Sequence, residues 1–261
     1  MKVNQVLHGN SIEVMKSIPR EFVDLTVTSP PYGTVRNYTG NNYSFDDFKH
    51  QVKELFRITK RGGVVVWVVR DQTENGSESG DSFRQALYFM ECGFNLHDTM
   101  IYAKNYYVPL THNRYEQAFE YMFVFSKGKP TTFNGLREKC SYEGAVQPTE
   151  WNAASSDDKC ALRKRKGGYV TKSSKLKSNI WYYSPGKRLD EIGNQHPAIF
   201  PYELAQDHIN TWTNSGDLVF DPMCGSGTTL VMAKELGRNF LGIDIVDKYV
   251  AISKERLGIN D

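Results

Sequence analysis

The sequence predicts an α/β fold in which a doubly wound, mostly parallel sheet is interrupted by one inserted segment. Strand patterns alternate with helix patterns over residues 1–130 and again over 181–261, as they do when helices cover both faces of such a sheet. Residues 131–180 lack either periodicity and are polar, basic and broken by Gly and Ser. A chain of 261 residues has room for one large core. We therefore predict one domain in two halves with an insertion between them.

The first half begins with a strand that ends at two prolines. Val23–Thr28 is rich in β-branched residues, and Pro30-Pro31 fixes the backbone soon after it. Ser44 and Asp47 have the spacing of a capping box, which predicts the start of an amphipathic helix that continues towards Gly62-Gly63. The rest of this half alternates in the same way: a strand at Val64–Val69, a helix marked by Phe83, Ala86, Leu87 and Met90, and strands at Thr99–Ala103 and Tyr121–Phe125.

Regular alternation returns in the second half. The predicted elements are a helix at Tyr202–Thr213, a strand at Leu218–Phe220, a helix at Thr228–Leu236, a strand at Asn239–Ile243 and a helix at Val246–Leu257. Gly237 and Gly258 follow two of these helices, as glycines at helix ends commonly do. The stretch without periodicity between the halves is long for a loop in a compact domain, which indicates a functional insertion.

The segment Phe220–Thr229 has the pattern of a ligand-binding turn between a strand and a helix. Gly225 and Gly227 let the backbone approach a ligand closely, and the amino end of the next helix offers free N–H groups. Asp244 ends the following strand, where a carboxylate can accept hydrogen bonds from ribose hydroxyls. Leu230 replaces the third glycine of a dinucleotide-binding turn, and the G-K-[ST] of a phosphate-binding loop is absent. The pattern favours an adenosyl ligand without a pyrophosphate; the alternative is a tight turn that binds nothing.

The Ser29-Pro30-Pro31-Tyr32 loop carries the groups that an exocyclic base amine needs in order to react. Such an amine is a weak nucleophile because its lone pair is delocalised into the ring, and acceptors for its hydrogens make the lone pair available. The Ser29 hydroxyl and the Pro30 carbonyl are candidate acceptors, and Tyr32 offers a face on which an extruded base can stack. The alternative interpretation of these four residues alone is a surface turn or a proline-rich ligand.

Positive charge is concentrated in one part of the insertion. The formal net charge of the chain is only +2, but between Lys159 and Lys177 there are eight basic residues and no acidic one. Such a run is either a solvated loop or a surface for phosphates.

Two further classes of protein are disfavoured by the sequence. Cys92, Cys140, Cys160 and Cys224 are widely spaced, so we expect free thiols and neither disulfides nor a metal site. The first seven residues lack the apolar core of a signal peptide, and no apolar run is long enough to span a membrane. We therefore expect a cytoplasmic protein without membrane contact.

The two motifs and their order resemble the β-group of DNA amino-methyltransferases, in which the catalytic motif precedes the cofactor motif. The segment from His196 to Pro201, His-Pro-Ala-Ile-Phe-Pro, is similar to the element that closes over the methionine part of S-adenosylmethionine in that family. Asp221–Thr229 is similar to its cofactor turn, with Met223 in place of the usual Phe. Gly9-Asn10 is similar to a Gly-Asp pair that contacts the adenine amino group, with Asn replacing Asp. The resemblance covers most of the chain.

This resemblance implies the S-adenosylmethionine-dependent methyltransferase fold with a permuted motif order. Residues 1–130 are then the catalytic half, 131–180 a target-recognition insertion and 181–261 the cofactor-binding half of the same domain. The implied catalytic residues are Ser29, Pro30, Pro31 and Tyr32. The implied cofactor-binding residues are Asn10, His196, Pro197, Phe200, Pro201, Asp221, Pro222, Cys224, Gly225, Ser226, Gly227, Thr228, Thr229, Asp244 and Ile245. Arg36, Arg163, Lys164, Arg165 and Lys166 are implied to contact DNA, and no metal is implied.

The resemblance also implies the substrate. Ser-Pro-Pro-Tyr is usual in family members that form N4-methylcytosine and Asp-Pro-Pro-Tyr in those that form N6-methyladenine, so Ser29 implies cytosine N4 in duplex DNA, with adenine N6 as the alternative. Attack by a cysteine on cytosine C5 is disfavoured because none of the four cysteines follows a proline. An RNA or protein amide methyltransferase and a DNA-binding module without turnover are the other interpretations.

Partners follow from the same resemblance. We expect double-stranded DNA as the substrate, S-adenosylhomocysteine as the second product and a bacterial or phage origin. A cognate restriction endonuclease is an expected partner in a restriction-modification system, and the protein is expected to be a monomer or a homodimer.

Overall fold

The computed structural model describes residues 1–31, 43–105, 113–141, 143–144, 146–147, 169–184 and 201–259, and its fold is the predicted α/β fold. The chain forms two compact units. Met1–Asn134 and Asn179–Asp261 make the larger unit, and Gly135–Ser178 makes the smaller one.

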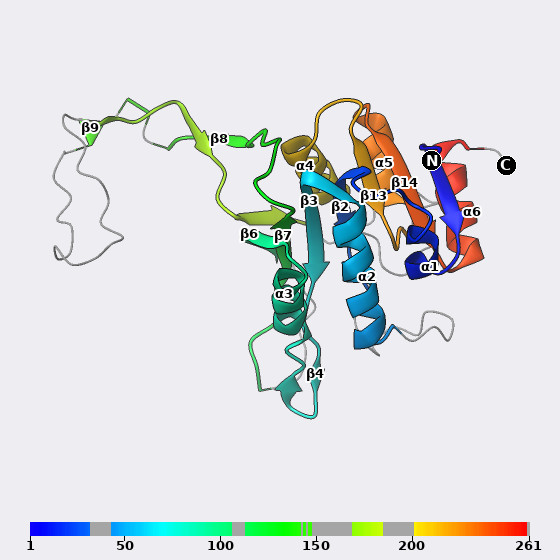
Figure 1. The fold of residues 1–261 in the computed structure, drawn as a ribbon. Helices are drawn as coiled ribbons and strands as arrows, with labels where there is room; N and C mark the ends of the chain where they lie inside the picture. The colour runs from blue at the N-terminus through cyan, green and yellow to red at the C-terminus, as the bar shows by residue number, and fades with distance from the viewer. Residues whose placement is uncertain are drawn as a thin grey trace. The chain divides into compact units, whose positions relative to one another are not determined.

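One sheet of eight strands forms the centre of the larger unit (Figure 1). In spatial order the strands are β1 (Gln5–His8), β14 (Asn239–Asp244), β13 (Leu218–Asp221), β2 (Val23–Thr28), β3 (Thr59–Val69), β7 (Phe119–Ser126), β6 (Asn95–Lys104) and β12 (Ile180–Tyr183). Strand β7 is antiparallel to both of its neighbours, and every other neighbouring pair is parallel. The sheet is therefore mostly parallel, as predicted.

Helices cover both faces of this sheet (Figure 1). One face carries α1 (Ser11–Met15), α2 (Phe45–Ile58) and α3 (Asp81–Glu91), and the other carries α4 (Tyr202–Trp212), α5 (Thr228–Glu235) and α6 (Asp247–Leu257). The helix α2 begins with the predicted capping box, in which the Ser44 hydroxyl and the Asp47 carboxylate each accept from the other residue's backbone N–H. The core between the helices and the sheet is rich in aromatic residues, with Phe48, Trp67, Phe89 and Phe125 fully buried.

The arrangement of parallel strands brings distant parts of the sequence to one edge. Strand β13 lies between β2 and β14, and all three run in the same direction. Their carboxyl ends, at Thr28, Asp221 and Asp244, therefore lie at the same edge of the sheet. Ligands of open α/β sheets bind at such carboxyl ends.

The smaller unit contains two short antiparallel pairs. Strand β8 (Arg137–Lys139) pairs with β11 (Ser174–Leu176), and β9 (Val146–Gln147) pairs with β10 (Tyr169–Val170). Lys175 forms an ion pair of 3.1 Å with Glu138 across the first pair. These pairings join the two ends of the segment in which the sequence shows no periodicity.

Some elements differ from those predicted. No sequence pattern predicted β1, α1 or β12, and none predicted regular structure between Asp71 and Asp81. The structure has a hairpin there, formed by β4 (Thr73–Glu74) and β5 (Ser77–Glu78). Buried Asp71 accepts hydrogen bonds from the Ser79 hydroxyl at 3.1 Å and from the Ser82 N–H at 3.1 Å, which ties the base of the hairpin to α3.

The helix α3 is present where it was predicted, but three of the residues that marked it are exposed. Phe83, Leu87 and Met90 are 54%, 60% and 47% exposed, whereas Ser82, Ala86 and Phe89 face the core. Phe83 and Leu87 are spaced for one face of a helix, and so are Ser82, Ala86 and Phe89. The pattern therefore identified the helix without identifying its buried side.

Candidate active site and cofactor site

The predicted glycine turn lies between β13 and α5 at the carboxyl edge of the sheet. Gly225 and Gly227 both have left-handed backbone conformations, with φ of 51° and 78°. A Cβ atom at Gly227 would lie 2.7 Å from the Ser253 Oγ, so the turn also needs glycine there for space. The first residue of α5 is Thr228, so the free N–H groups of the helix begin at the turn.

Two side chains of α6 hold this turn from behind. The Ser253 hydroxyl on α6 donates to the Gly225 carbonyl at 2.7 Å. Arg256, also on α6, donates to the Ser226 carbonyl and to the Tyr202 hydroxyl on α4. The turn is therefore fixed before any ligand binds.

Gly227→Ala is expected to lower the midpoint of thermal unfolding and to weaken S-adenosylmethionine binding at least tenfold. The left-handed conformation costs an alanine about 1 kcal/mol, and overpacking against Ser253 adds about 1–3 kcal/mol. Gly128→Ala is the matched control, because Gly128 has φ of 81° but nothing within 4 Å of where its methyl group would lie. Scanning calorimetry and calorimetric titration measure both effects. Equal losses in the two variants would show that backbone strain alone is responsible.

Asp244 accepts hydrogen bonds from the predicted cofactor turn and from the start of α6. Its Oδ2 accepts from the Gly225 N–H at 2.8 Å, and its Oδ1 accepts from the Val246 N–H at 2.9 Å. Burial raises the pKa of Asp244, and these backbone hydrogen bonds oppose that rise. Ile245 follows with a side chain that is 40% exposed, so a charged acceptor and an apolar surface stand next to each other. A ribose and its base need these two surfaces.

The predicted catalytic loop and the predicted cofactor turn are joined by a buried hydrogen bond. Thr28 Oγ1, at the end of β2, donates to Asp221 Oδ1 at 2.7 Å. The same oxygen accepts from the Met223 N–H at 3.1 Å, inside the turn. Thr28 directly precedes Ser29, so Asp221 fixes the start of one loop relative to the other. In the sequence, Thr28 carries only the signal of a β-branched residue in a strand, which predicts no role in the site.

The buried position of Asp221 gives the free protein a specific pH dependence. Burial raises the pKa of Asp221 from 3.8 to about 6, although hydrogen bonds from Thr28, the Met223 backbone and Thr229 oppose the rise. A carboxyl with a higher pKa in the folded state binds its proton more tightly there. Its contribution to the free energy of unfolding therefore falls as pH rises through this window.

We expect wild type to lose about 2 kcal/mol of unfolding free energy relative to Asp221→Asn between about pH 4.5 and 7. The asparagine keeps an Oδ1 acceptor for Thr28 but carries no charge. Urea unfolding without cofactor, at several pH values, gives the difference. Asp217→Asn is the control, since Asp217 accepts one exposed hydrogen bond, from the Asn214 N–H. Parallel pH profiles for wild type and Asp221→Asn would contradict the prediction.

The described part of the catalytic loop lies at the same edge. Ser29 is half-buried and Pro30 is buried, immediately after the Thr28–Asp221 hydrogen bond. Pro31 is half-buried as well, and Tyr32 lies outside the described residues. The Ser29 hydroxyl therefore follows a rigid strand end, where an acceptor can be preorganised.

The remaining predicted cofactor residues lie in several parts of the chain. Asn10 begins α1, where its Oδ1 accepts from the Ile12 N–H at 2.9 Å; it lies two residues after His8, which pairs with Asp244 in the sheet. The Cys224 thiol is buried under the turn, 4.0 Å from the Ser253 Oγ, and burial raises its pKa. Pro201 is buried at the start of α4. His196, Pro197 and Phe200 lie outside the described residues, as do all five predicted DNA contacts, Arg36, Arg163, Lys164, Arg165 and Lys166.

The turn also contains a buried polar atom that fits an absent ligand. Thr228 Oγ1 is buried and, within the described part of the chain, has no hydrogen-bond partner. Buried hydroxyls are normally paired, so this one fits a site that a polar ligand completes. Over the same residues, no cluster of three or more His, Cys, Asp or Glu side chains is placed to hold a metal ion. None of the described helices is both long and apolar enough to cross a bilayer.

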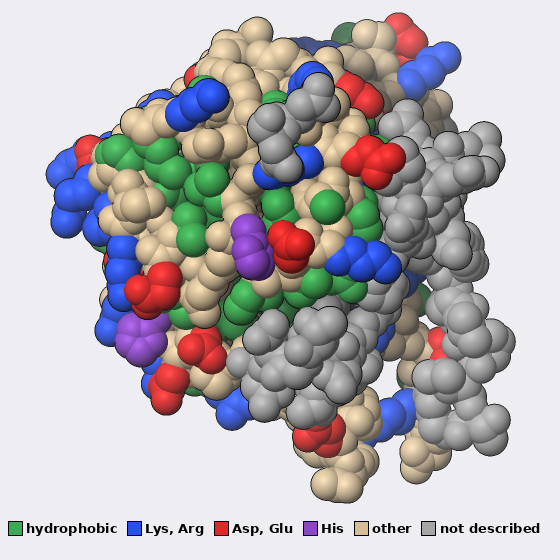
Figure 2. Space-filling model, turned by 90° about the vertical axis from the view of Figure 1, so that its right-hand side faces the viewer, with side chains coloured by type: hydrophobic (Ala, Val, Ile, Leu, Met, Phe, Trp, Pro, Cys, Tyr) green, Lys and Arg blue, Asp and Glu red, His purple; other side chains and the backbone are tan. Residues whose placement is uncertain are grey.

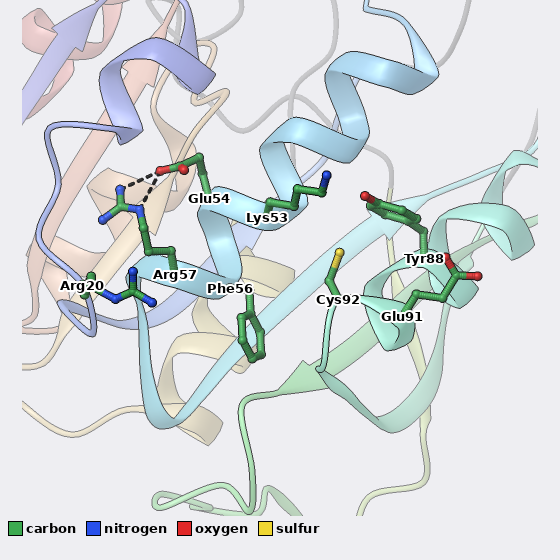
Figure 3. A pocket seen from close by; sticks show the side chains of 8 residues that line it. All are labelled: Arg20, Lys53, Glu54, Phe56, Arg57, Tyr88, Glu91 and Cys92. Atoms are coloured by element: carbon green, nitrogen blue, oxygen red, sulfur yellow. Dashed lines mark hydrogen bonds and ion pairs between the residues drawn. The ribbon is translucent and has the colours of Figure 1, made fainter.

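A pocket of about 520 Å³ lies elsewhere, between α2 and α3 (Figure 3). Its lining residues are Arg20, Lys53, Glu54, Phe56, Arg57, Tyr88, Glu91 and Cys92. Arg57 pairs with Glu54 at 2.6 Å and also donates to the Met15 and Ile18 carbonyls. These residues tie α2 to the end of α1, and none of them belongs to the predicted site.

The described surface on the side of α6 has a mixed charge. Figure 2 shows acidic, basic and hydrophobic side chains interspersed on this face, and its described residues form no broad basic surface. A duplex needs many phosphate contacts from Lys and Arg. The described residues on this face therefore do not have the charge pattern of a DNA-binding surface.

Comparison with known proteins gives three kinds of match. The sequence model of a family of N6 and N4 enzymes, described as DNA methylase, matches residues 23–255. The orphan methyltransferase M.BamHII of Bacillus amyloliquefaciens is 51% identical over 90% of this chain and 88% of its own. A candidate DNA modification methylase from Thermus thermophilus, complexed with S-adenosylmethionine, is 26% identical over 98% of this chain and 95% of that one, with a TM-score of 0.64. The cytosine-N4-specific PvuII DNA methyltransferase is 20% identical over 98% of this chain and 86% of that one, with a TM-score of 0.70, and shows the fold alone.

Proposed function

Because the chain belongs to the DNA methylase family of N6 and N4 enzymes, we propose that it methylates the exocyclic N4 of cytosine in duplex DNA. It is a DNA methyltransferase that uses S-adenosylmethionine. The choice of cytosine rests on Ser29 in the catalytic loop, since a hydroxyl occupies the position where enzymes specific for adenine usually have a carboxylate.

The observation that supports this function best is the hydrogen bond from Thr28 to Asp221. It joins the ends of the neighbouring strands β2 and β13, from which the proposed catalytic loop and the proposed cofactor turn begin. Methyl transfer needs the amine and the methyl donor within contact distance, and rigid positioning accounts for much of the rate that such enzymes gain. A loop and a turn that share one buried carboxylate satisfy that need.

In the proposed reaction the protein activates the amine by accepting its hydrogens. Ser29 Oγ and the Pro30 carbonyl accept one hydrogen each, so that the nitrogen lone pair turns out of the ring plane towards the methyl group. S-adenosylmethionine supplies that methyl group on a positively charged sulfur. The amine nitrogen would take the methyl group, S-adenosylhomocysteine would leave with the electron pair of the broken carbon–sulfur bond, and the nitrogen would release one proton to water. Tyr32 is proposed to stack on the flipped base.

The cofactor is proposed to lie across the carboxyl ends of β13 and β14. Asp244 would accept the ribose hydroxyls and Ile245 would cover one side of the adenine. Asn10 would contact the adenine edge through its amide N–H₂, since its Oδ1 caps α1. His196, Pro197, Phe200 and Pro201 are proposed to hold the methionine part. Cys224 belongs to the turn from Asp221 to Thr229, and its thiol is buried. At this residue the backbone, and not the side chain, would face the ligand.

Residues 131–180 are proposed to recognise the target sequence. The basic run from Lys159 to Lys177 would contact phosphates, and Arg36 and Arg163 to Lys166 are the proposed DNA contacts. We propose that the protein acts in the cytoplasm of a bacterium, as the methylating half of a restriction-modification system or without a nuclease, as the orphan relative does.

Incubation with labelled S-adenosylmethionine and duplex DNA, followed by separation of the nucleosides, tests the function. Label in N4-methylcytosine is the expected result. Label only in N6-methyladenine would support the assignment as a DNA methyltransferase and reject cytosine as its target base. Label in RNA or protein, with none in duplex DNA, would reject both. Sequencing of the modified DNA then gives the recognition sequence.

A further inference from the structure

The first residue of α4 is bound by an arginine of the last helix. Arg256, in the last turn of α6, donates to the Tyr202 hydroxyl, and its guanidinium carbon lies 5.4 Å from the centre of the Tyr202 ring. Tyr202 is buried and Arg256 is half-buried, so the contact is largely shielded from solvent. A charge-assisted hydrogen bond and a cation–π contact therefore act together on one buried tyrosine.

The same arginine also holds the predicted cofactor turn. A second guanidinium nitrogen of Arg256 donates to the Ser226 carbonyl, between the two left-handed glycines. Arginine can make both contacts because the nitrogens of its planar fork point in fixed directions, whereas lysine has a single nitrogen. Arg256 thus joins three elements: α6, the start of α4 and the turn before α5.

These contacts connect two separate parts of the proposed cofactor site. Tyr202 directly follows Pro201, the last residue of the His-Pro-Ala-Ile-Phe-Pro element that is proposed to hold the methionine part. Ser226 belongs to the turn that is proposed to bind the adenosyl part. The two segments are separated in the sequence by α4 and β13, so their relative position depends on tertiary contacts such as those of Arg256.

The position of Arg256 differs from that of an arginine that only joins two helices. Arg238 donates to the carbonyls of Thr213 and Leu236, at the carboxyl ends of α4 and α5, where a cation complements the helix dipoles. Arg256 instead brings its guanidinium to the amino ends of the same two helices, where free N–H groups already carry partial positive charge. Positive charge gathered in this way favours a nearby anion, and the methionine part of the cofactor carries a carboxylate.

On the proposed placement of the cofactor, we propose that Arg256 and Tyr202 are a positioning pair for its methionine part. Neither side chain needs to touch the cofactor, because Arg256 holds the turn at Ser226 and the start of α4 at Tyr202 in one fixed geometry. Without the pair, the turn is still held by Ser253 and Asp244 and still binds the adenosyl part. The start of α4 is then less firmly fixed relative to the turn, so the methionine part, which spans the two segments, loses affinity.

Calorimetric titration of the full-length protein without DNA, with two ligands that share the adenosine and its thioether, tests the pair. S-adenosylhomocysteine carries the amino-acid part, and methylthioadenosine lacks it. Tyr202→Phe removes only the hydroxyl, and Arg256→Lys keeps the charge. Each is expected to weaken S-adenosylhomocysteine binding about tenfold and to leave methylthioadenosine binding within about twofold. The double variant is expected to bind S-adenosylhomocysteine about as well as the weaker single variant, because both substitutions break the same contact.

Two matched controls change the same chemical groups elsewhere on these helices. Tyr183→Phe removes a hydroxyl that donates to Asp207 on α4 at 2.8 Å. Arg238→Lys disturbs the link between the carboxyl ends of α4 and α5. Both variants are expected to leave the ratio of the two affinities unchanged.

The ratio separates a positioning role from a structural one. Equal losses for both ligands in Tyr202→Phe and Arg256→Lys would overturn the proposal and make the pair a structural brace. No loss for either ligand would overturn it as well. A wild type that binds both ligands with equal affinity would instead reject the placement of the methionine part, and the positioning role with it. None of these outcomes depends on which base is methylated.

Discussion

Asp244→Asn is expected to weaken S-adenosylmethionine binding about 100-fold, although it changes a single atom. The two carboxylate oxygens each accept a backbone N–H, from Gly225 and from Val246. An asparagine has one oxygen and one N–H₂ group. Its N–H₂ group, a hydrogen-bond donor, must therefore face one of the two backbone N–H groups, which are donors as well. The loss of one charge-assisted hydrogen bond costs about 1.5–3 kcal/mol, and about 2.7 kcal/mol corresponds to 100-fold. The disturbed residue on one side, Gly225, belongs to the cofactor turn.

The variant is compared with Asp217→Asn by calorimetric titration of cofactor without DNA. Asp217 also accepts a backbone N–H, from Asn214 at 2.7 Å, but it lies just before β13, at the end of that strand away from the turn. Its substitution is expected to leave the affinity for cofactor within twofold. Burial raises the pKa of Asp244, so this carboxylate takes up a proton at a higher pH than an ordinary aspartate does. As the pH is lowered, cofactor binding by wild type is therefore expected to weaken at a higher pH than it would with an ordinary aspartate. An Asp244→Asn affinity equal to wild type would remove this residue from the cofactor site.

For helices and strands with strong local sequence signals, the first or last residue could be predicted as well as the type of element. The strand Val23–Thr28 has the bounds that its β-branched run and the following prolines predict. The start of α2 is where its capping box predicts it, because both partners of that motif lie within four residues. The cofactor turn is equally local, since strand, glycines and helix follow one another. Family membership was also predicted from these motifs and their order, and the comparisons confirm it.

Features that depend on distant residues could not be predicted. The short strand β1 and helix α1 carry too few residues for a periodic signal, and β12 lies beside a segment without one. The hydrogen bond from Thr28 to Asp221 joins residues far apart in the sequence, and nothing near Thr28 indicates its partner. Ser253 likewise supports the turn from a helix whose sequence pattern shows only amphipathic character. The topology that brings these residues together is a property of the whole sheet.

Ser29→Ala is expected to lower the rate of methyl transfer by about 10²–10³ while leaving cofactor affinity within twofold. The removal of one preorganised hydrogen-bonding group at a reacting centre typically has an effect of this size. The Ser29 backbone continues directly from Thr28, whose hydrogen bond to Asp221 does not involve the Ser29 side chain, so the loop is expected to keep its place.

Single-turnover rates with saturating DNA and cofactor measure the chemical step for Ser29→Ala. Ser17→Ala removes the same atom from a hydroxyl that donates to the Val14 carbonyl at 2.7 Å on the surface, and its rate is expected to equal that of wild type. A reduced rate with unchanged cofactor affinity would place the Ser29 hydroxyl in the activation of the amine. A weaker affinity with an unchanged rate would make Ser29 a binding residue. In that case the choice between cytosine and adenine could no longer rest on this side chain, because a hydroxyl that does not touch the amine cannot distinguish the two bases.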